Sequence, residues 1–119
     1  KLLRGETVHL VYDVRENPLY NLQCGQALLE IIKRKPGGVF HLAGGEIVNR
    51  YEFALTLAKV FGLDKSLLVP VKSSFFPSIA PRPKDTTFDT RRMEKELGIK
   101  PLSVAEGLTS MKSHMKIKP

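Results

Sequence analysis

GVFHLAGG, residues 38–45, is a short apolar run that ends in two glycines. Apolar residues that follow one another without alternation are typical of a strand buried on both faces of a parallel sheet. A helical pattern over residues 20–35 precedes this run, and a β-branched, aromatic segment over residues 7–12 precedes the helix. The order strand, helix, strand predicts a βαβ unit and therefore an α/β fold.

The sequence after this βαβ pattern contains two capping boxes, in which a polar N-cap residue is followed three positions later by glutamate. Asn49 and Glu52 predict a helix that ends at Gly62, and Ser103 and Glu106 predict the last helix. The other expected elements are a short strand over residues 67–71, a proline-containing loop over residues 72–88 and a short helix over residues 90–97.

The chain has 119 residues, of which 42% are hydrophobic and 26% charged, and this composition fits a single soluble domain over residues 1–119. Its formal charge of +7 favours anionic partners without choosing among nucleic acids, acidic membranes and nucleotide phosphates. No apolar run approaches the roughly 20 residues that span a bilayer, and no secretory signal is recognisable. Because the sequence begins at Lys1 rather than methionine, we expect it to be part of a longer protein.

Cys24 is the single cysteine, so the chain can form neither an intramolecular disulfide nor a multi-cysteine metal site. This fits the reducing cytoplasm, and we expect a cytoplasmic protein. The cysteine lies on the helix predicted over residues 20–35, and we interpret it as a packing residue rather than a catalytic thiol. The apolar face predicted for that helix comprises Cys24, Ala27, Leu28, Ile31 and Ile32.

Sequence patterns for a self-contained active site are missing. Gly44-Gly45 follows a predicted strand, but its spacing is not the G-x-G-x-x-G of dinucleotide-binding loops, so a tight turn explains it. The histidines His9, His41 and His114 lack the spacing of zinc ligands, and no G-x-S-x-G nucleophile motif occurs. His41 could act as a general base, although a core or turn-lining histidine is the favoured interpretation.

Two other positions are candidates for ligand binding. Asp13 follows the first predicted strand, at the end where open α/β sheets bind ligands, but an aspartate that caps a turn is an equal alternative. Arg82 lies between Pro81 and Pro83 in the stiffened segment of residues 80–86. Such an arginine suits a phosphate or carboxylate, whereas pairing with Asp85 or Asp89 would merely fix the loop.

Three segments together resemble dTDP-4-dehydrorhamnose reductases and related extended short-chain dehydrogenases/reductases. The first is GVFHLAGG followed by NRYEFA at residues 49–54, and the second is RPKDTTFDT at residues 82–90 with a trailing Leu97-Gly98-Ile99. The third is the opening Val11-Tyr12-Asp13 with Asn17-Pro18, in which Val14 and Leu19 replace the usual Gln and Thr. The resemblance covers almost the whole chain in the right order.

The resemblance implies a substrate-binding fragment: a βαβ unit plus a small, mostly helical subdomain, without the amino-terminal Rossmann core. The family's Tyr-x-x-x-Lys pair is not found here, because Tyr12, Tyr20 and Tyr51 lack a lysine four residues on. We therefore expect no catalytic residues in this chain, which alone should be inactive. The intact protein would use NADP or NAD to reduce the 4-keto group of a dTDP-sugar in dTDP-L-rhamnose biosynthesis.

Carried over to matching positions, the resemblance implies substrate-binding roles for Arg82 and Asp85, with Asp13 and Pro18 shaping the edge of the cleft. The expected partners are a dTDP-sugar, the Rossmann domain and possible self-association as a homodimer. No cofactor, metal, nucleic acid or membrane is expected to bind this part. The alternatives are a non-catalytic regulatory or interaction module with the same fold and a basic nucleic-acid-binding domain.

Overall fold

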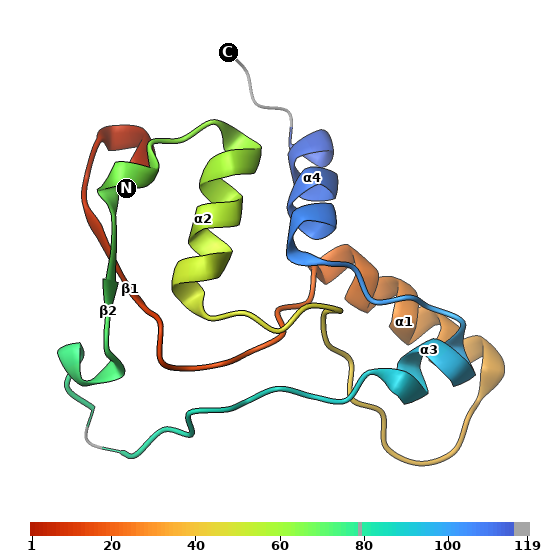
Figure 1. The fold of residues 1–119 in the computed structure, drawn as a ribbon. Helices are drawn as coiled ribbons and strands as arrows, with labels where there is room; N and C mark the ends of the chain where they lie inside the picture. Colours follow the sequence, from red (N-terminus) through yellow and green to blue (C-terminus); the bar gives the residue numbers. More distant parts are fainter. Residues whose placement is uncertain (79, 116–119) are drawn as a thin grey trace. The chain divides into compact units, whose positions relative to one another are not determined.

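The computed structural model describes residues 1–78 and 80–115 (Figure 1). The chain divides into two compact units. Unit 1 comprises residues 1–16 and 48–86, and unit 2 comprises residues 17–47 and the chain from residue 87 onward. No helix in the described ranges is long and apolar enough to cross a membrane.

Unit 1 is built on a pair of parallel strands, β1 (Val8–Val11) and β2 (Leu68–Val71). Helix α2 (Arg50–Phe61) precedes β2, and its buried Ala54 and Ala58 pack with Leu68 and the half-buried side chains of β1. Parallel strands need a long crossover, usually with a helix that covers the sheet, and α2 is the helix in this crossover that packs on the strands. The strands predicted at residues 7–12 and 67–71 are therefore confirmed.

Helix α2 begins and ends as its sequence predicts. The Asn49 side chain accepts a hydrogen bond from the Glu52 amide at 2.8 Å, and the Glu52 carboxylate accepts from the Asn49 amide at 2.9 Å. Gly62 closes the helix in the left-handed conformation, with φ of 67°. The described residues of unit 1 also form three short 3-10 turns: η1 (Leu2–Arg4), η2 (Lys65–Leu67) and η3 (Ser73–Phe75).

Unit 2 is helical and comprises α1 (Asn21–Arg34), α3 (Arg91–Leu97) and α4 (Val104–His114). Its core is formed by Ala27 of α1 with Met93 and Leu97 of α3, and partly buried side chains pack around them. The capping box that begins α4 at Ser103 is present as predicted. The three helices of this unit thus match the predicted positions.

The strand predicted over residues 38–45 does not form, so the parallel pair joins β1 to β2 instead. A strand exists only where its backbone groups pair with a neighbouring strand. Here they bond elsewhere: the Val39 carbonyl accepts from the Arg92 guanidinium at 2.6 Å, and the Gly44 and Gly45 amides donate to Asn17 and Leu102. The α/β class is confirmed, whereas the second strand of the predicted βαβ unit is wrong.

The apolar face predicted for α1 is only partly buried. Ala27 is buried and Cys24 half-buried, but Leu28 and Ile32 are 50% and 67% exposed. Leu22 and Leu29 are also exposed. The buried side of α1 is set by α3 and by residues 100–102, because the Gln23 side-chain nitrogen donates to the Lys100 carbonyl and its side-chain oxygen accepts from the Leu102 amide. Among the described residues, a second apolar face of α1 is therefore left open to solvent.

Candidate functional site

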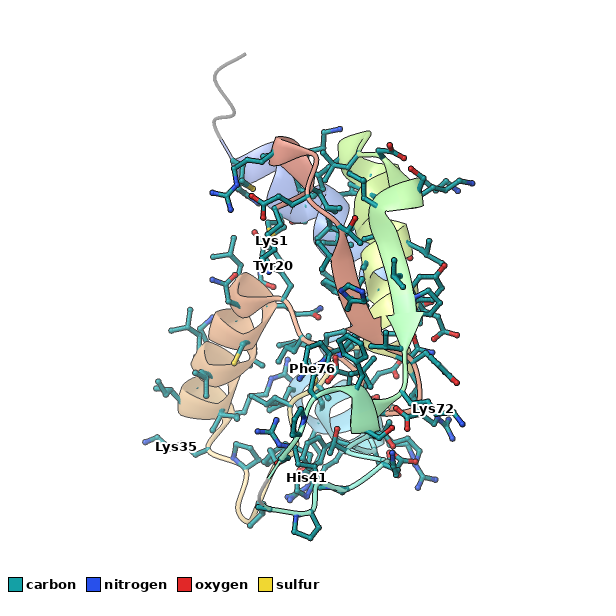
Figure 2. The ribbon with its side chains drawn as sticks, turned by 90° about the vertical axis from the view of Figure 1, so that its left-hand side faces the viewer. Lys1, Tyr20, Lys35, His41, Lys72 and Phe76 are labelled. Atoms are coloured by element: carbon teal, nitrogen blue, oxygen red, sulfur yellow. The ribbon has the colours of Figure 1, made fainter. Side chains whose placement is uncertain are left out.

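A cluster of polar side chains in unit 1 lies where its two parallel strands end. Asp13 follows β1, and Ser73 begins the turn η3 directly after β2. Carboxyl ends of parallel strands meet at one edge of the sheet, where α/β proteins commonly bind ligands. Figure 2 labels Lys72 and Phe76, which flank η3 at this edge. We call this group of residues the strand-end site; it comprises Asp13, Arg15, Lys72, Ser73, Phe75, Phe76 and Lys84.

Asp13 holds the strand-end site together. One of its carboxylate oxygens accepts from the Ser73 amide at 2.7 Å, and the other accepts from the Ser73 hydroxyl at 3.0 Å and from Lys84 Nζ at 2.6 Å. Lys84 also donates to the Ser73 hydroxyl. The hydrogen bond from Lys84, supported by those from Ser73, lowers the pKa of Asp13 to about 2. Asp13 is thus ionised at neutral pH and fixes residues from two distant segments.

The loop that carries Arg82 is anchored at its far end by backbone pairing. The Arg15 amide donates to the Lys84 carbonyl at 2.8 Å, and the Thr86 amide donates to the Arg15 carbonyl at 3.0 Å. Asp85 also lies 3.8 Å from the Arg15 guanidinium. Arg82 itself is exposed. Because the loop is tied at residues 84–86, Arg82 is presented to solvent from a fixed base.

The acidic partners suggested for Arg82 have other partners in the structure. Asp85 pairs with Arg15, and Asp89 accepts hydrogen bonds from the Arg91 amide and guanidinium. The bond to Arg91 lowers the pKa of Asp89 to about 2. The contacts described for these two carboxylates are thus with Arg15 and Arg91.

An exposed aromatic cluster adjoins Asp13 and was not anticipated from the sequence. The His9 ring stacks on the Phe75 ring with centroids 4.9 Å apart, and the Phe76 ring meets Phe75 edge-on at 5.1 Å. Phe75 and Phe76 are 54% and 49% exposed. Successive side chains of a strand point to opposite faces, so the position of His9 between the apolar Val8 and Leu10 was the sequence signal that the His9 side chain faces outward.

Pro18 belongs to unit 2, where its carbonyl lies against Gly44. A Cβ at Gly44 would lie 2.0 Å from the Pro18 carbonyl oxygen, and one at Gly45 would lie 2.5 Å from the Pro101 carbonyl oxygen. Neither glycine has a positive φ. The glycines are required by close backbone packing and not, as expected, by the geometry of a tight turn.

Asn17 connects three segments of unit 2 next to this packing. It is buried, and its amide nitrogen donates to the Gly44 carbonyl at 3.1 Å and to the Phe88 carbonyl at 2.9 Å. Its side-chain oxygen accepts from the Phe88 amide at 3.0 Å. The sequence showed Asn17 only as part of a turn, since its partners lie 27 and 71 residues away.

His41 is exposed, so the core part of the favoured interpretation, a core or turn-lining histidine, is wrong. Its ring stacks on Phe88 with centroids 4.8 Å apart, because residues 38–45 form no strand and His41 points away from the core on which Phe40 and Leu42 pack. Within the described part of the chain, no group of three His, Cys, Asp or Glu side chains is placed to hold a metal ion.

Comparison with known proteins gives one family match and several related proteins. The family model described as the RmlD substrate binding domain matches residues 1–117. The spore coat polysaccharide biosynthesis protein SpsK of Bacillus subtilis is 27% identical over 103 residues, which are 87% of this chain and 35% of SpsK. The probable low-salt glycan biosynthesis reductase Agl14 of Haloferax volcanii is 25% identical over 112 residues, 94% of this chain and 37% of Agl14.

Solved structures with the same fold include two dTDP-4-dehydrorhamnose reductases. The enzyme from Bacillus anthracis, in complex with NADP, aligns with a TM-score of 0.82 at 22% identity over 92% of this chain and 39% of its own. The enzyme from Clostridium acetobutylicum aligns with a TM-score of 0.82 at 23% identity, with the same coverage of 92% and 39%. This chain spans less than two-fifths of the length of these four proteins.

Proposed function

Because the chain belongs to the RmlD substrate binding domain family, we propose that it holds the sugar-nucleotide substrate of an NAD(P)H-dependent reductase. The substrate would be a dTDP-sugar whose 4-keto group is reduced, as in the formation of dTDP-L-rhamnose. The observation that carries this proposal is the strand-end site, in which cations and aromatic rings gather at the carboxyl ends of parallel strands.

Next to the strand-end site, on the loop that Lys84 anchors, we assign Arg82 to the diphosphate. Its guanidinium can donate two parallel hydrogen bonds to phosphate oxygens, and the prolines on both sides restrict the loop that carries it. Asp13 and Asp85 then act by fixing this loop, through Lys84 and Arg15 respectively. Pro18, the fourth proposed substrate-binding residue, lies in unit 2.

The residues of this chain do not fit a dinucleotide cofactor. A dinucleotide-binding loop uses glycines so that the backbone can approach the pyrophosphate. The space next to Gly44 and Gly45 is filled by the carbonyls of Pro18 and Pro101. We therefore propose that NADP or NAD binds another part of the intact protein, together with the catalytic groups, and that this chain alone is inactive.

The open face of α1 supports the proposal that unit 2 packs against that other part. Leu22, Leu28, Leu29 and Ile32 are 47% to 67% exposed on one helix. An apolar face of this kind usually marks an interface. The relatives are more than twice as long as this chain, so the remainder of the same protein is the proposed occupant. Self-association through the face and a purely regulatory role are the alternatives.

Titration calorimetry with dTDP and with the 4-keto dTDP-sugar tests the proposal, on the intact protein and on this chain. We expect binding to the intact protein and weaker binding to the chain alone. Absence of binding to the intact protein would favour the regulatory alternative.

The role of Arg82 is tested by steady-state kinetics of the intact reductase. Arg82→Ala should raise KM for the nucleotide sugar by about 10- to 150-fold, which corresponds to roughly 1.5–3 kcal/mol for a lost charge-assisted contact. Arg4→Ala is the matched control, because Arg4 is also exposed but precedes β1, at the opposite end of the strands. An unchanged KM in the Arg82 variant would refute the role of Arg82 in binding the diphosphate.

A further inference from the structure

We infer that Phe76 is the stacking surface for the nucleobase of the nucleotide ligand, an inference that rests on the proposed function and adds the site for the base. The ring lies at the end of η3, directly after Ser73–Phe75, and is 49% exposed. A nucleotide needs a flat apolar surface for its base and cations for its phosphates. The strand-end site offers both on adjoining segments.

The aromatic cluster leaves Phe76 as its available ring. Phe75 is stacked in parallel on His9, with an angle of 16° between the planes. The plane of the Phe76 ring is nearly at right angles to that of Phe75, with an angle of 80°. Among the described residues, no ring stacks in parallel on Phe76. A base can therefore stack on Phe76 without displacing the His9–Phe75 pair, which instead supports Phe76 from the side.

The turn that carries the ring is fixed before any ligand binds. The amide and the hydroxyl of Ser73 are both bonded to Asp13, and Lys84 bonds to both residues. The Phe75 and Phe76 amides donate to the carbonyls of Lys72 and Ser73, which closes the turn. An aromatic side chain on a fixed turn loses little conformational freedom on binding, so more of the stacking energy contributes to affinity.

Charge at the site favours a nucleotide over other apolar ligands. Lys72 directly precedes η3, Lys84 bonds to its first residue, and Arg82 lies two positions from Lys84. Asp13 neutralises Lys84, whereas Lys72 and Arg82 are exposed. A mononucleotide also fits better than a nucleic acid strand, because strand binding uses successive stacking rings along a basic groove. Here the carboxylates of Asp13 and Asp85 interrupt the basic surface.

The test measures binding of dTDP, thymidine and pyrophosphate to the full-length protein by titration calorimetry. Phe76→Ala should weaken dTDP binding by roughly tenfold, within the range measured for base–aromatic stacking, and should leave pyrophosphate binding unchanged. Phe76→Leu keeps the apolar bulk and should lose affinity similarly, whereas Phe76→Trp should retain it. The ring current of Phe76 should also shift the thymine methyl proton signal upfield, and this shift should vanish in Phe76→Ala.

Phe88→Ala is the matched control. Phe88 is 50% exposed and likewise lies against a histidine ring, but it belongs to unit 2. Its replacement should leave dTDP affinity unchanged.

The outcomes separate this inference from the proposed function. If the wild type binds dTDP and Phe76→Ala binds it with equal affinity, the role of Phe76 is refuted and the proposed function stands. No binding of dTDP to the wild type would overturn both. Tighter binding of single-stranded DNA than of dTDP, with a steep dependence on salt, would also overturn the inference in favour of a nucleic-acid surface.

Discussion

Replacing Gly44 with alanine tests whether this glycine is required by close backbone packing. The added Cβ would lie 2.0 Å from the Pro18 carbonyl oxygen and 2.9 Å from its carbon. A Cβ atom essentially never lies within 3.0 Å of a non-bonded heavy atom, so the backbone on one side must move by about 1 Å to relieve the contact with the oxygen. Overpacking of this kind costs about 1–3 kcal/mol, and we expect the upper value because backbone, not a flexible side chain, stands in the way.

For a chain of 119 residues, each kcal/mol lost corresponds to about 4 °C in Tm, so Gly44→Ala should lower Tm by about 12 °C. Thermal unfolding followed by far-ultraviolet circular dichroism measures the change. Gly25→Ala is the matched control: Gly25 lies within α1, and a Cβ there meets nothing within 4 Å. It should raise Tm by about 2–4 °C, since alanine favours a helix by about 0.5–1 kcal/mol over glycine. A Tm for Gly44→Ala within 2 °C or so of the wild type would refute the packing argument.

Three further predictions concern stability. Ser103→Ala should lower the free energy of unfolding by about 1 kcal/mol in urea titrations, whereas Thr90→Ala should have almost no effect, because the Ser103 side chain caps its helix and that of Thr90 does not. Asn17→Ala should cost about 2–3 kcal/mol in the same assay, since its three hydrogen bonds are lost inside the protein; a cost below 0.5 kcal/mol or so would contradict its role in joining the segments. The lowered pKa of Asp13 should stabilise the fold above pH 4 or so, and this contribution should disappear as pH falls towards about 2. As pH is lowered, the urea midpoint of unfolding should therefore fall less steeply in Asp13→Asn than in the wild type. Identical slopes in the two proteins would exclude a contribution from Asp13.

Local sequence signals were sufficient to predict the helices. The capping boxes at Asn49 and Ser103 and the terminal glycines Gly62 and Gly98 depend on residues within one or two turns of each other. These capping interactions need only residues that are close together in the sequence, so they do not depend on distant parts of the chain. The order of the motifs likewise indicated the family, and the match over residues 1–117 confirmed it.

Pairing and burial depended on partners that are distant in sequence. Residues 38–45 have the composition of a buried strand, but their backbone groups bond to Asn17, Arg92 and Leu102, so they form none. The buried side of α1 was likewise decided by α3, whose approach no periodicity within α1 encodes.

The strand-end site shows the same division between sequence and structure. The sequence by itself determined that Asp13 follows a strand and that Arg82 lies on a stiffened loop, because both are properties of neighbouring residues. Only the tertiary structure decided that Asp13 bonds Ser73 and Lys84, 60 and 71 residues away, and that His9 stacks on Phe75. Parallel pairing of β1 with β2 brings those segments to one edge, and that pairing is a property of the whole fold of unit 1.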